Sequence, residues 1–152
     1  MMADTGSDPF DLDRFVLAQE AIYARVLAEL TQGRKVTHWM WFIFPQIAGL
    51  GSSDMARHYA IRSIAEAQAY LAHPLLGVRY RECVAALRDL VGTTAETVFG
   101  AVDAAKLRSS LTLFAEAAAD DPHLVAALRH WFSGEIDQRT MIILGSLAIP
   151  HG

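Results

Sequence analysis

Residues 15–30 of the chain, FVLAQEAIYARVLAEL, carry its clearest helical signal. Apolar side chains recur there every three or four positions, at Phe15, Ala18, Ile22, Val26 and Leu30. Because an α-helix completes a turn every 3.6 residues, this spacing places all five side chains on one face. The pattern predicts one amphipathic helix that begins near Asp11 or Asp13 and ends at Gly33.

The same spacing recurs through the rest of the chain between helix start and stop signals. Ser63 followed by Glu66, for example, has the spacing of a capping box. Strict alternation of apolar and polar residues, which marks a half-buried strand, persists nowhere. We therefore predict an all-α fold, a compact single-domain bundle of about seven or eight helices over residues 11–149. Residues 1–10 are predicted to be a disordered or frayed tail.

Composition narrows the function classes. The chain of 152 residues is 53% hydrophobic, has a net charge of −4 and contains no run of basic residues, which argues against binding to nucleic acid or to an acidic membrane. Its longest apolar run, residues 39–44, is far shorter than the ~20 residues of a membrane span. The N-terminus has no signal-peptide pattern, so we expect a cytoplasmic protein. Cys83, the single cysteine, is expected to be a buried structural thiol.

The aromatic segment His38–Gln46, HWMWFIFPQ, is the most unusual stretch. Trp39 and Trp41 cannot share one narrow helical face, so one ring is expected to line a cleft, where it can stack on a base, a nicotinamide or a sugar. His38 and Gln46 would then supply directional hydrogen bonds, and His38 is a candidate general acid or base. Periodicity alone favours the simpler interpretation, a hydrophobic central helix whose polar ends bond to the backbone.

A second candidate region is the predicted helix over residues 103–114. Asp103, Lys106 and Ser110 follow at helical spacing, and Ser109 and Ser110 occupy mid-helix positions that hydroxyl residues do not favour. These features suggest a polar pocket, a tight helix crossing, or a Ser–Lys nucleophile. Helix statistics favour Asp103 as a helix cap with Lys106 as its solvated neighbour.

Metal and cofactor chemistry find little support in the sequence. The six histidines include no His-x3-His pair, and one cysteine cannot build a structural zinc site. The stretch Gly49–Gly51 lacks the Lys-Ser/Thr of a phosphate-binding loop. We predict neither a metal nor a cofactor.

The aromatic segment and the following Gly49–Ser53 turn, with further matches at His73–Gly77, Asp103–Leu107 and Ser109–Phe114, resemble domain-of-unknown-function family 1810, uncharacterised bacterial proteins often labelled calpastatin. The likeness covers about residues 10–147 and implies a compact, all-helical fold. Inhibitors of the calpastatin kind fold on binding, whereas a chain this apolar should fold alone. A looser likeness, to helical N-glycosidases that act on ADP-ribose derivatives, is one of fold alone.

Two functions from different classes follow. The first is binding or processing of a nucleotide-like small molecule, related to ADP-ribose or NAD, in a cleft between the aromatic segment and residues 103–114. The alternative is a non-enzymatic protein-interaction module with the aromatic segment as its core. Whether the protein is an enzyme stays open, and the oligomeric state is not predicted. The catalytic candidates are His38, Asp103 and Lys106. The ligand-binding candidates are Trp39, Trp41, Gln46, Ser52, Ser53, Ser109 and Ser110.

Overall fold

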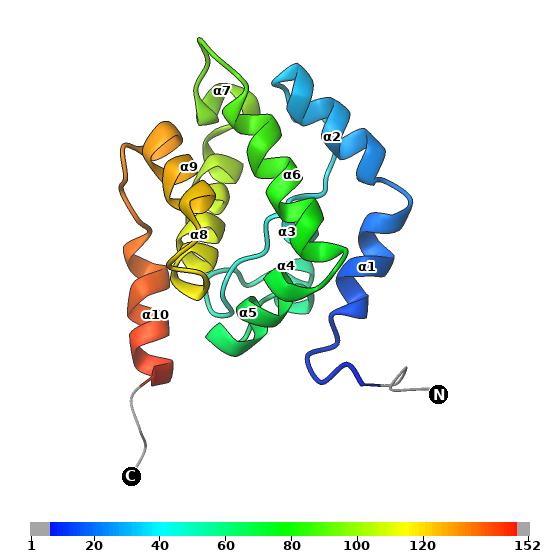
Figure 1. Cartoon of the computed structure of the whole chain (residues 1–152), viewed down its shortest axis with the longest axis vertical. Coiled ribbons are helices and arrows are strands. Elements are labelled where there is room, and N and C mark those ends of the chain that lie inside the picture. The colour runs from blue at the N-terminus through cyan, green and yellow to red at the C-terminus, as the bar shows by residue number, and fades with distance from the viewer. Residues whose placement is uncertain (1–6, 149–152) are drawn as a thin grey trace.

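Ten helices and no strand run through residues 7–148, the part of the chain that the computed structural model describes (Figure 1). They are α1 (Asp13–Glu20), α2 (Tyr23–Gln32), α3 (Met40–Ile43), α4 (Asp54–His58), α5 (Ile64–Ala72), α6 (Leu76–Arg88), α7 (Ala95–Phe99), α8 (Ala101–Ala117), α9 (Pro122–Phe132) and α10 (Gln138–Ala148). The predicted all-α class is confirmed. The helix number exceeds the predicted seven or eight because the first predicted helix is divided in two and because α3, α4 and α7 are short elements of four or five residues. No helix in the described part of the chain is long and apolar enough to cross a bilayer.

The single helix predicted from Asp11 or Asp13 to Gly33 is instead two helices, α1 and α2. The chain turns at Ala21 and Ile22, although neither glycine nor proline interrupts the pattern. The break lets α1 pack against α3 while α2 packs against α6. Gln19, near the end of α1, points inward and donates a hydrogen bond to the Phe42 carbonyl at 2.7 Å. Tertiary contacts therefore override the helical periodicity here.

The first helix is capped from a position earlier than the sequence suggests. The Asp8 carboxylate accepts hydrogen bonds from the backbone N–H groups of Leu12 (2.8 Å) and Asp13 (2.9 Å). This residue lies within the range predicted as a tail, and it satisfies two of the free N–H groups at the start of α1. Residues 1–6 of that range, and residue 149 at the end of the predicted domain, lie outside the described residues.

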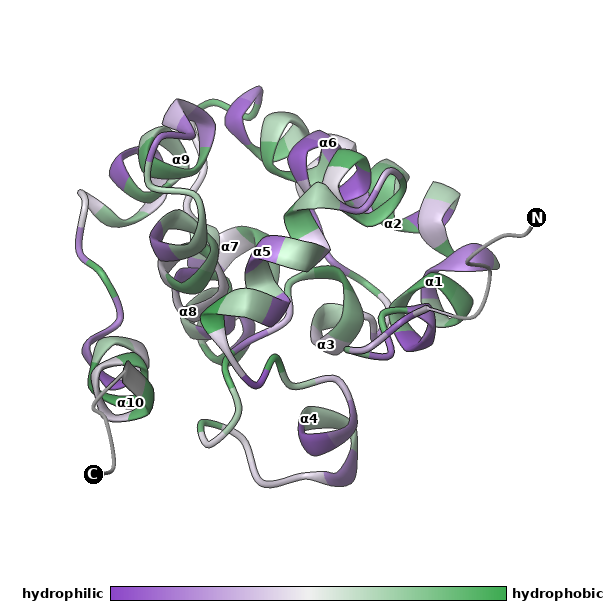
Figure 2. Cartoon of the chain, turned by 60° about the horizontal axis from the view of Figure 1, so that its bottom comes forward, coloured by the Kyte–Doolittle hydropathy of each residue, from purple (hydrophilic) through white to green (hydrophobic). Residues whose placement is uncertain are grey.

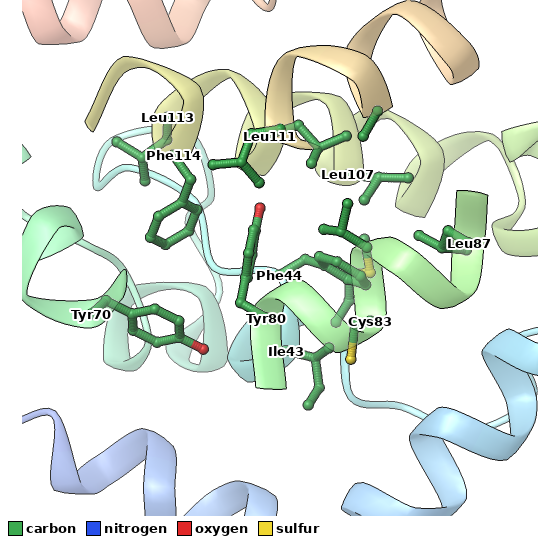
Figure 3. Packing of buried hydrophobic residues seen from close by; sticks show 14 of the residues in the cluster. Ile43, Phe44, Tyr70, Tyr80, Cys83, Leu87, Leu107, Leu111, Leu113 and Phe114 are labelled. Atoms are coloured by element: carbon green, nitrogen blue, oxygen red, sulfur yellow. The ribbon is translucent and has the colours of Figure 1, made fainter. Parts of the chain in front are cut away.

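The core is organised around α8, which packs against α5, α7, α9 and α10. Aromatic side chains form its centre, where Tyr80 lies between Phe44 and Phe114 (Figure 3), with ring centroids 5.6 and 4.5 Å away. Tyr70 also packs against Phe114, with ring centroids 5.2 Å apart, and lies 6.2 Å from Tyr80. The buried Tyr80 hydroxyl shares a 2.9 Å hydrogen bond with Ser110 of α8, so this polar pair is satisfied inside the core.

A buried carboxylate ties the aromatic segment to α2. Glu29 accepts four hydrogen bonds, from the backbone N–H groups of Val36 and Thr37, the Thr37 hydroxyl and the Trp39 indole, at 2.7–3.1 Å. Burial alone would raise the pKa of Glu29, but these hydrogen bonds outweigh it and lower the pKa to about 2. The start of the aromatic segment is thereby fixed, and the Trp39 ring is directed into the core.

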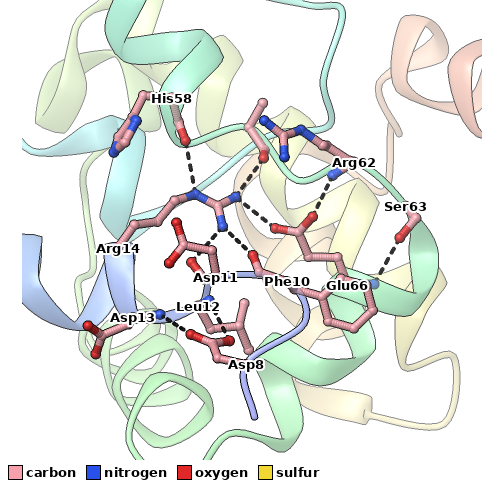
Figure 4. Close-up of polar contacts among 11 residues, drawn as sticks. Asp8, Phe10, Asp11, Leu12, Asp13, Arg14, His58, Arg62, Ser63 and Glu66 are labelled. Atoms are coloured by element: carbon pink, nitrogen blue, oxygen red, sulfur yellow. Dashed lines mark hydrogen bonds and ion pairs between the residues drawn. The ribbon is translucent and has the colours of Figure 1, made fainter. Parts of the chain in front are cut away.

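A second polar contact anchors the loop that follows the aromatic segment. Arg14 of α1 donates hydrogen bonds to the His58 and Ala60 carbonyls, both at 2.9 Å, and to the Glu66 carboxylate at 2.7 Å (Figure 4). The Arg14 and Glu66 side chains are only 7% and 2% exposed. The Glu66 N–H bonds to the Ser63 hydroxyl, which is one half of the predicted capping box, while the Glu66 carboxylate accepts the N–H of Arg62 rather than that of Ser63.

We expect Glu29→Gln to lower the free energy of unfolding at pH 7 by about 2–3 kcal/mol, because the amide nitrogen cannot accept the hydrogen bonds that the carboxylate accepts. The folded-state pKa of about 2 lies below the ordinary 4.5, so the wild type loses this stabilisation as the pH falls from about 4.5 towards 2. Urea unfolding at pH 7 and pH 3 should therefore show a difference between variant and wild type that shrinks at pH 3. Glu20→Gln, at an exposed glutamate of α1, is the control. A pH-independent difference would contradict this account.

Arg14→Met is expected to cost about 3–5 kcal/mol of stability, because it leaves the Glu66 carboxylate buried without its cation. The double variant with Glu66→Gln should lose less than the sum of the two single variants, by about 1–3 kcal/mol. Chemical denaturation of the four proteins in this cycle measures the coupling. Additive losses would show that the two side chains stabilise the fold independently.

Candidate ligand-binding site

A cavity of about 250 Å³ opens beside the aromatic segment. Two stretches of chain form its walls, the segment from Trp41 to Gly51 and the segment from Ala56 to Arg62. Its lining residues are Trp41, Gln46, Ile47, Ala48, Gly49, Gly51, Ala56, Arg57, Tyr59, Ala60 and Arg62. None of them carries a carboxylate, and two carry a guanidinium. The cavity therefore has an aromatic wall and a positively charged wall.

The short helix α3 explains why Trp41 is available. Met40, Phe42 and Ile43 of this helix are buried, whereas Trp41 is half-buried and lines the cavity. Pro45, two residues after the last residue of α3, has no backbone N–H with which to prolong the helix. After Pro45, the chain from Gln46 to Gly51 continues along one wall of the cavity.

A small piece of backbone pairing closes the loop around the cavity. Ile47 and Ile61 form an isolated parallel bridge, in which the Ala48 N–H bonds to the Ile61 carbonyl at 2.8 Å and the Ile61 N–H bonds to the Gln46 carbonyl at 2.9 Å. The backbone of Gln46 is thus engaged in the bridge, and Gln46 is one of the residues that line the cavity. No hydrogen bond to the side-chain amide of Gln46 occurs among residues 7–148, so its donor and acceptor are available to a ligand.

Two glycines in this loop are required by geometry. Gly49 has a φ of 104°, a conformation that other residues rarely adopt. A Cβ atom at Gly51 would lie 2.6 Å from the Cβ of Ala56, well inside van der Waals contact. The loop therefore passes close to α4, which buries none of its own residues and lies at the edge of the molecule (Figure 2).

Charges around the cavity are predominantly positive. Arg57 and Arg62 are exposed lining residues, and Arg57 has a solvent-exposed ion pair with Asp54 at 3.2 Å. The Arg62 side chain has no hydrogen-bond or ion-pair partner within the described residues. Lys106 of α8 does not line the cavity, but its Nζ lies 5.5 Å from the centroid of the Trp41 ring.

Of the candidates selected from the sequence, the structure places Trp41 and Gln46 at the cavity. Trp39 is buried in the core, where its indole N–H bonds to Glu29. His38 is exposed and does not line the cavity. Ser52 and Ser53 are exposed in the loop, and the Ser53 hydroxyl caps α4 by accepting the Ala56 N–H.

The candidates on α8 lie elsewhere. Asp103 forms ion pairs with Lys35 (2.9 Å) and Lys106 (3.6 Å). Ser109 is buried and bonds to the Ala105 carbonyl, while Ser110 bonds to Tyr80 in the core. The predicted cleft between the aromatic segment and residues 103–114 is therefore not where the cavity forms. The cavity forms between the aromatic segment and the loop that follows it.

The sequence interpretation missed the two cavity arginines and the residue that anchors their loop. Arg57 and Arg62 have no recognisable spacing motif, and their one signal is their position shortly after the Gly49–Ser53 turn. Arg14 lies 52 residues before its partner Glu66, so nothing local indicates the pair.

Two further features bear on possible chemistry. Burial raises the pKa of the Cys83 thiol to about 12, so this cysteine is protonated at neutral pH and buried as predicted. Across residues 7–148, no three His, Cys, Asp or Glu side chains converge in a way that could hold a metal ion.

Comparison with known proteins agrees with this helical architecture. The model of a family described as a protein of unknown function, DUF1810, matches residues 9–144. The chain is 50% identical to the conserved hypothetical protein Rv1873 from Mycobacterium tuberculosis, whose crystal structure it matches with a TM-score of 0.89 over 91% of this chain and 99% of that one. Among curated proteins, none matches. On the extent of the family match, the chain belongs to the DUF1810 family.

Proposed function

We propose that the cavity beside Trp41 binds a nucleotide-like small molecule. An aromatic ring of the ligand stacks on Trp41, and a phosphate group meets Arg57 and Arg62. Derivatives of ADP-ribose and NAD belong to this ligand class, because each joins an aromatic ring to phosphate through a ribose.

The charge of the lining carries the proposal. Two guanidinium groups and no carboxylate line the cavity, so an anion is favoured over a cation or a neutral sugar. Arginine presents planar, forked donors that match phosphate oxygens two at a time. Arg62 has its donors available, since no ion pair with it is found in the described part of the chain.

The aromatic wall supports the same class of ligand. A tryptophan ring stacks on any of the bases, because every base has a π-face. Tyr59, a second aromatic residue of the lining, is held by Phe15 and Phe42, whose ring centroids lie 5.8 and 5.3 Å away. Such fixed aromatic walls lose little conformational entropy when a ligand binds.

Directional recognition would come from Gln46. Its side-chain amide offers both a donor and an acceptor, which can pair with the edge of a base. Because the bridge to Ile61 fixes the backbone of Gln46, the amide starts from a restricted position. His38, Asp103 and Lys106 do not line the cavity, so the proposal concerns binding and assigns no reaction to these residues.

Titration with AMP, ADP-ribose and NAD tests the proposal through tryptophan fluorescence. We expect at least one of these ligands to quench the emission, because stacking places the base on Trp41. Trp41→Phe should abolish the quench. Arg62→Gln should weaken binding about tenfold or more, since a charge-assisted hydrogen bond contributes roughly 1.5–3 kcal/mol.

Two variants serve as matched controls. Trp131→Phe should leave the quench intact, because Trp131 lies outside the cavity and its indole N–H has no partner among residues 7–148. Arg25→Gln, at an exposed arginine of α2, should bind as the wild type does. The proposal is wrong if none of the ligands changes the fluorescence or the melting temperature of the wild type.

A further inference from the structure

We infer that the cavity accepts a single nucleoside monophosphate unit and selects an uncharged aromatic ring over a cationic one. This inference rests on the proposed function, and it narrows the ligand class in two respects. The first respect is size, and the second is the charge of the ring that stacks on Trp41.

The size of the cavity limits how much of a ligand it can enclose. Its volume of about 250 Å³ lies just below the roughly 300–1,000 Å³ of pockets that enclose drug-sized molecules. The lining offers Trp41 as its one tryptophan, while the ring of Tyr59 is already packed against Phe15 and Phe42. The two arginines are five residues apart on the same wall. A dinucleotide would bring two rings and two phosphates, so one half of it would remain outside.

A cation next to Trp41 determines whether a neutral or a cationic ligand ring stacks there more tightly. The Nζ of Lys106 lies 5.5 Å from the centroid of the Trp41 ring, within the range of a cation–π contact. Because Lys106 does not line the cavity, it reaches the indole from outside the space in which a ligand ring would stack. A cationic ligand ring would compete with Lys106 for the same π-electrons and would be repelled by its charge.

The charge of Lys106 is only partly neutralised. Its acidic partner, Asp103, lies 3.6 Å away and is shared with Lys35, which is closer at 2.9 Å. One carboxylate thus serves two ammonium groups, and the more distant of the two, Lys106, is the one beside Trp41. Arg62, which has no ion-pair partner within the described residues, adds a further positive charge, whereas Arg57 is paired with Asp54. A ring with its own positive charge therefore meets repulsion from both sides.

Oxidised and reduced nicotinamide mononucleotide form a matched pair of probes, because they share ribose and phosphate and differ in the charge of the ring. Isothermal titration should show the reduced form binding about tenfold more tightly than the oxidised form. Lys106→Met should bring this ratio below about threefold, while Arg25→Met should leave it unchanged. A loss of phosphate attraction would weaken both forms equally, so the ratio reports on the ring alone.

The size limit is tested with AMP and ADP-ribose on the same protein. ADP-ribose should bind within about threefold of AMP, since only its AMP half enters the cavity. Equal affinities for the two nicotinamide forms, a ratio that Lys106→Met does not change, or ADP-ribose at least about tenfold tighter than AMP would each overturn the inference and leave the proposed function standing. Failure of all four ligands to bind would overturn both.

Discussion

Four hydrogen bonds to the Glu29 carboxylate determine how the aromatic segment enters the fold. They hold residues 36–39 against α2, and the bond to the Trp39 indole fixes that ring in the core. Once Trp39 points inward, the single turn of α3 carries Trp41 to a different side, where it forms a wall of the cavity. The hydrogen bonds of Glu29 in α2 therefore also determine that the half-buried ring of Trp41 faces the cavity.

Periodicity predicted the fold class because most of the helices bury one apolar stripe, and this information is local. The break between α1 and α2 could not be predicted in this way. It depends on the inward hydrogen bond of Gln19 to Phe42, 23 residues later in the chain. The mid-helix hydroxyls of α8 indicated a polar contact, but only the structure shows which groups they bond to. Ser110 meets Tyr80, and Ser109 bonds back to its own helix, as buried hydroxyls often do.

The candidate site was predictable only where its residues carry a local sequence signal. Trp41 and Gln46 stood out because a dense aromatic segment with polar ends is rare, whereas Arg57 and Arg62 look like ordinary surface residues. The position of these two arginines depends on Arg14, which donates hydrogen bonds to the carbonyl groups of His58 and Ala60. Both carbonyl groups belong to residues that lie between Arg57 and Arg62 in the sequence. Which arginines face a cavity is thus decided by a buried contact with α1, far away in the chain.

The bridge between Ile47 and Ile61 has a consequence for how ligand preference can change in this family. The bridge joins the two ends of the loop that contains α4, so residues 48–60 form a surface loop whose ends lie close together. The entropic cost of closing such a loop rises only slowly with its length. Insertions and deletions at the exposed residues 52–55 should therefore be tolerated by the aromatic core, because Arg14 still anchors residues 58–60. A new specificity can then arise by exchange of this exposed stretch.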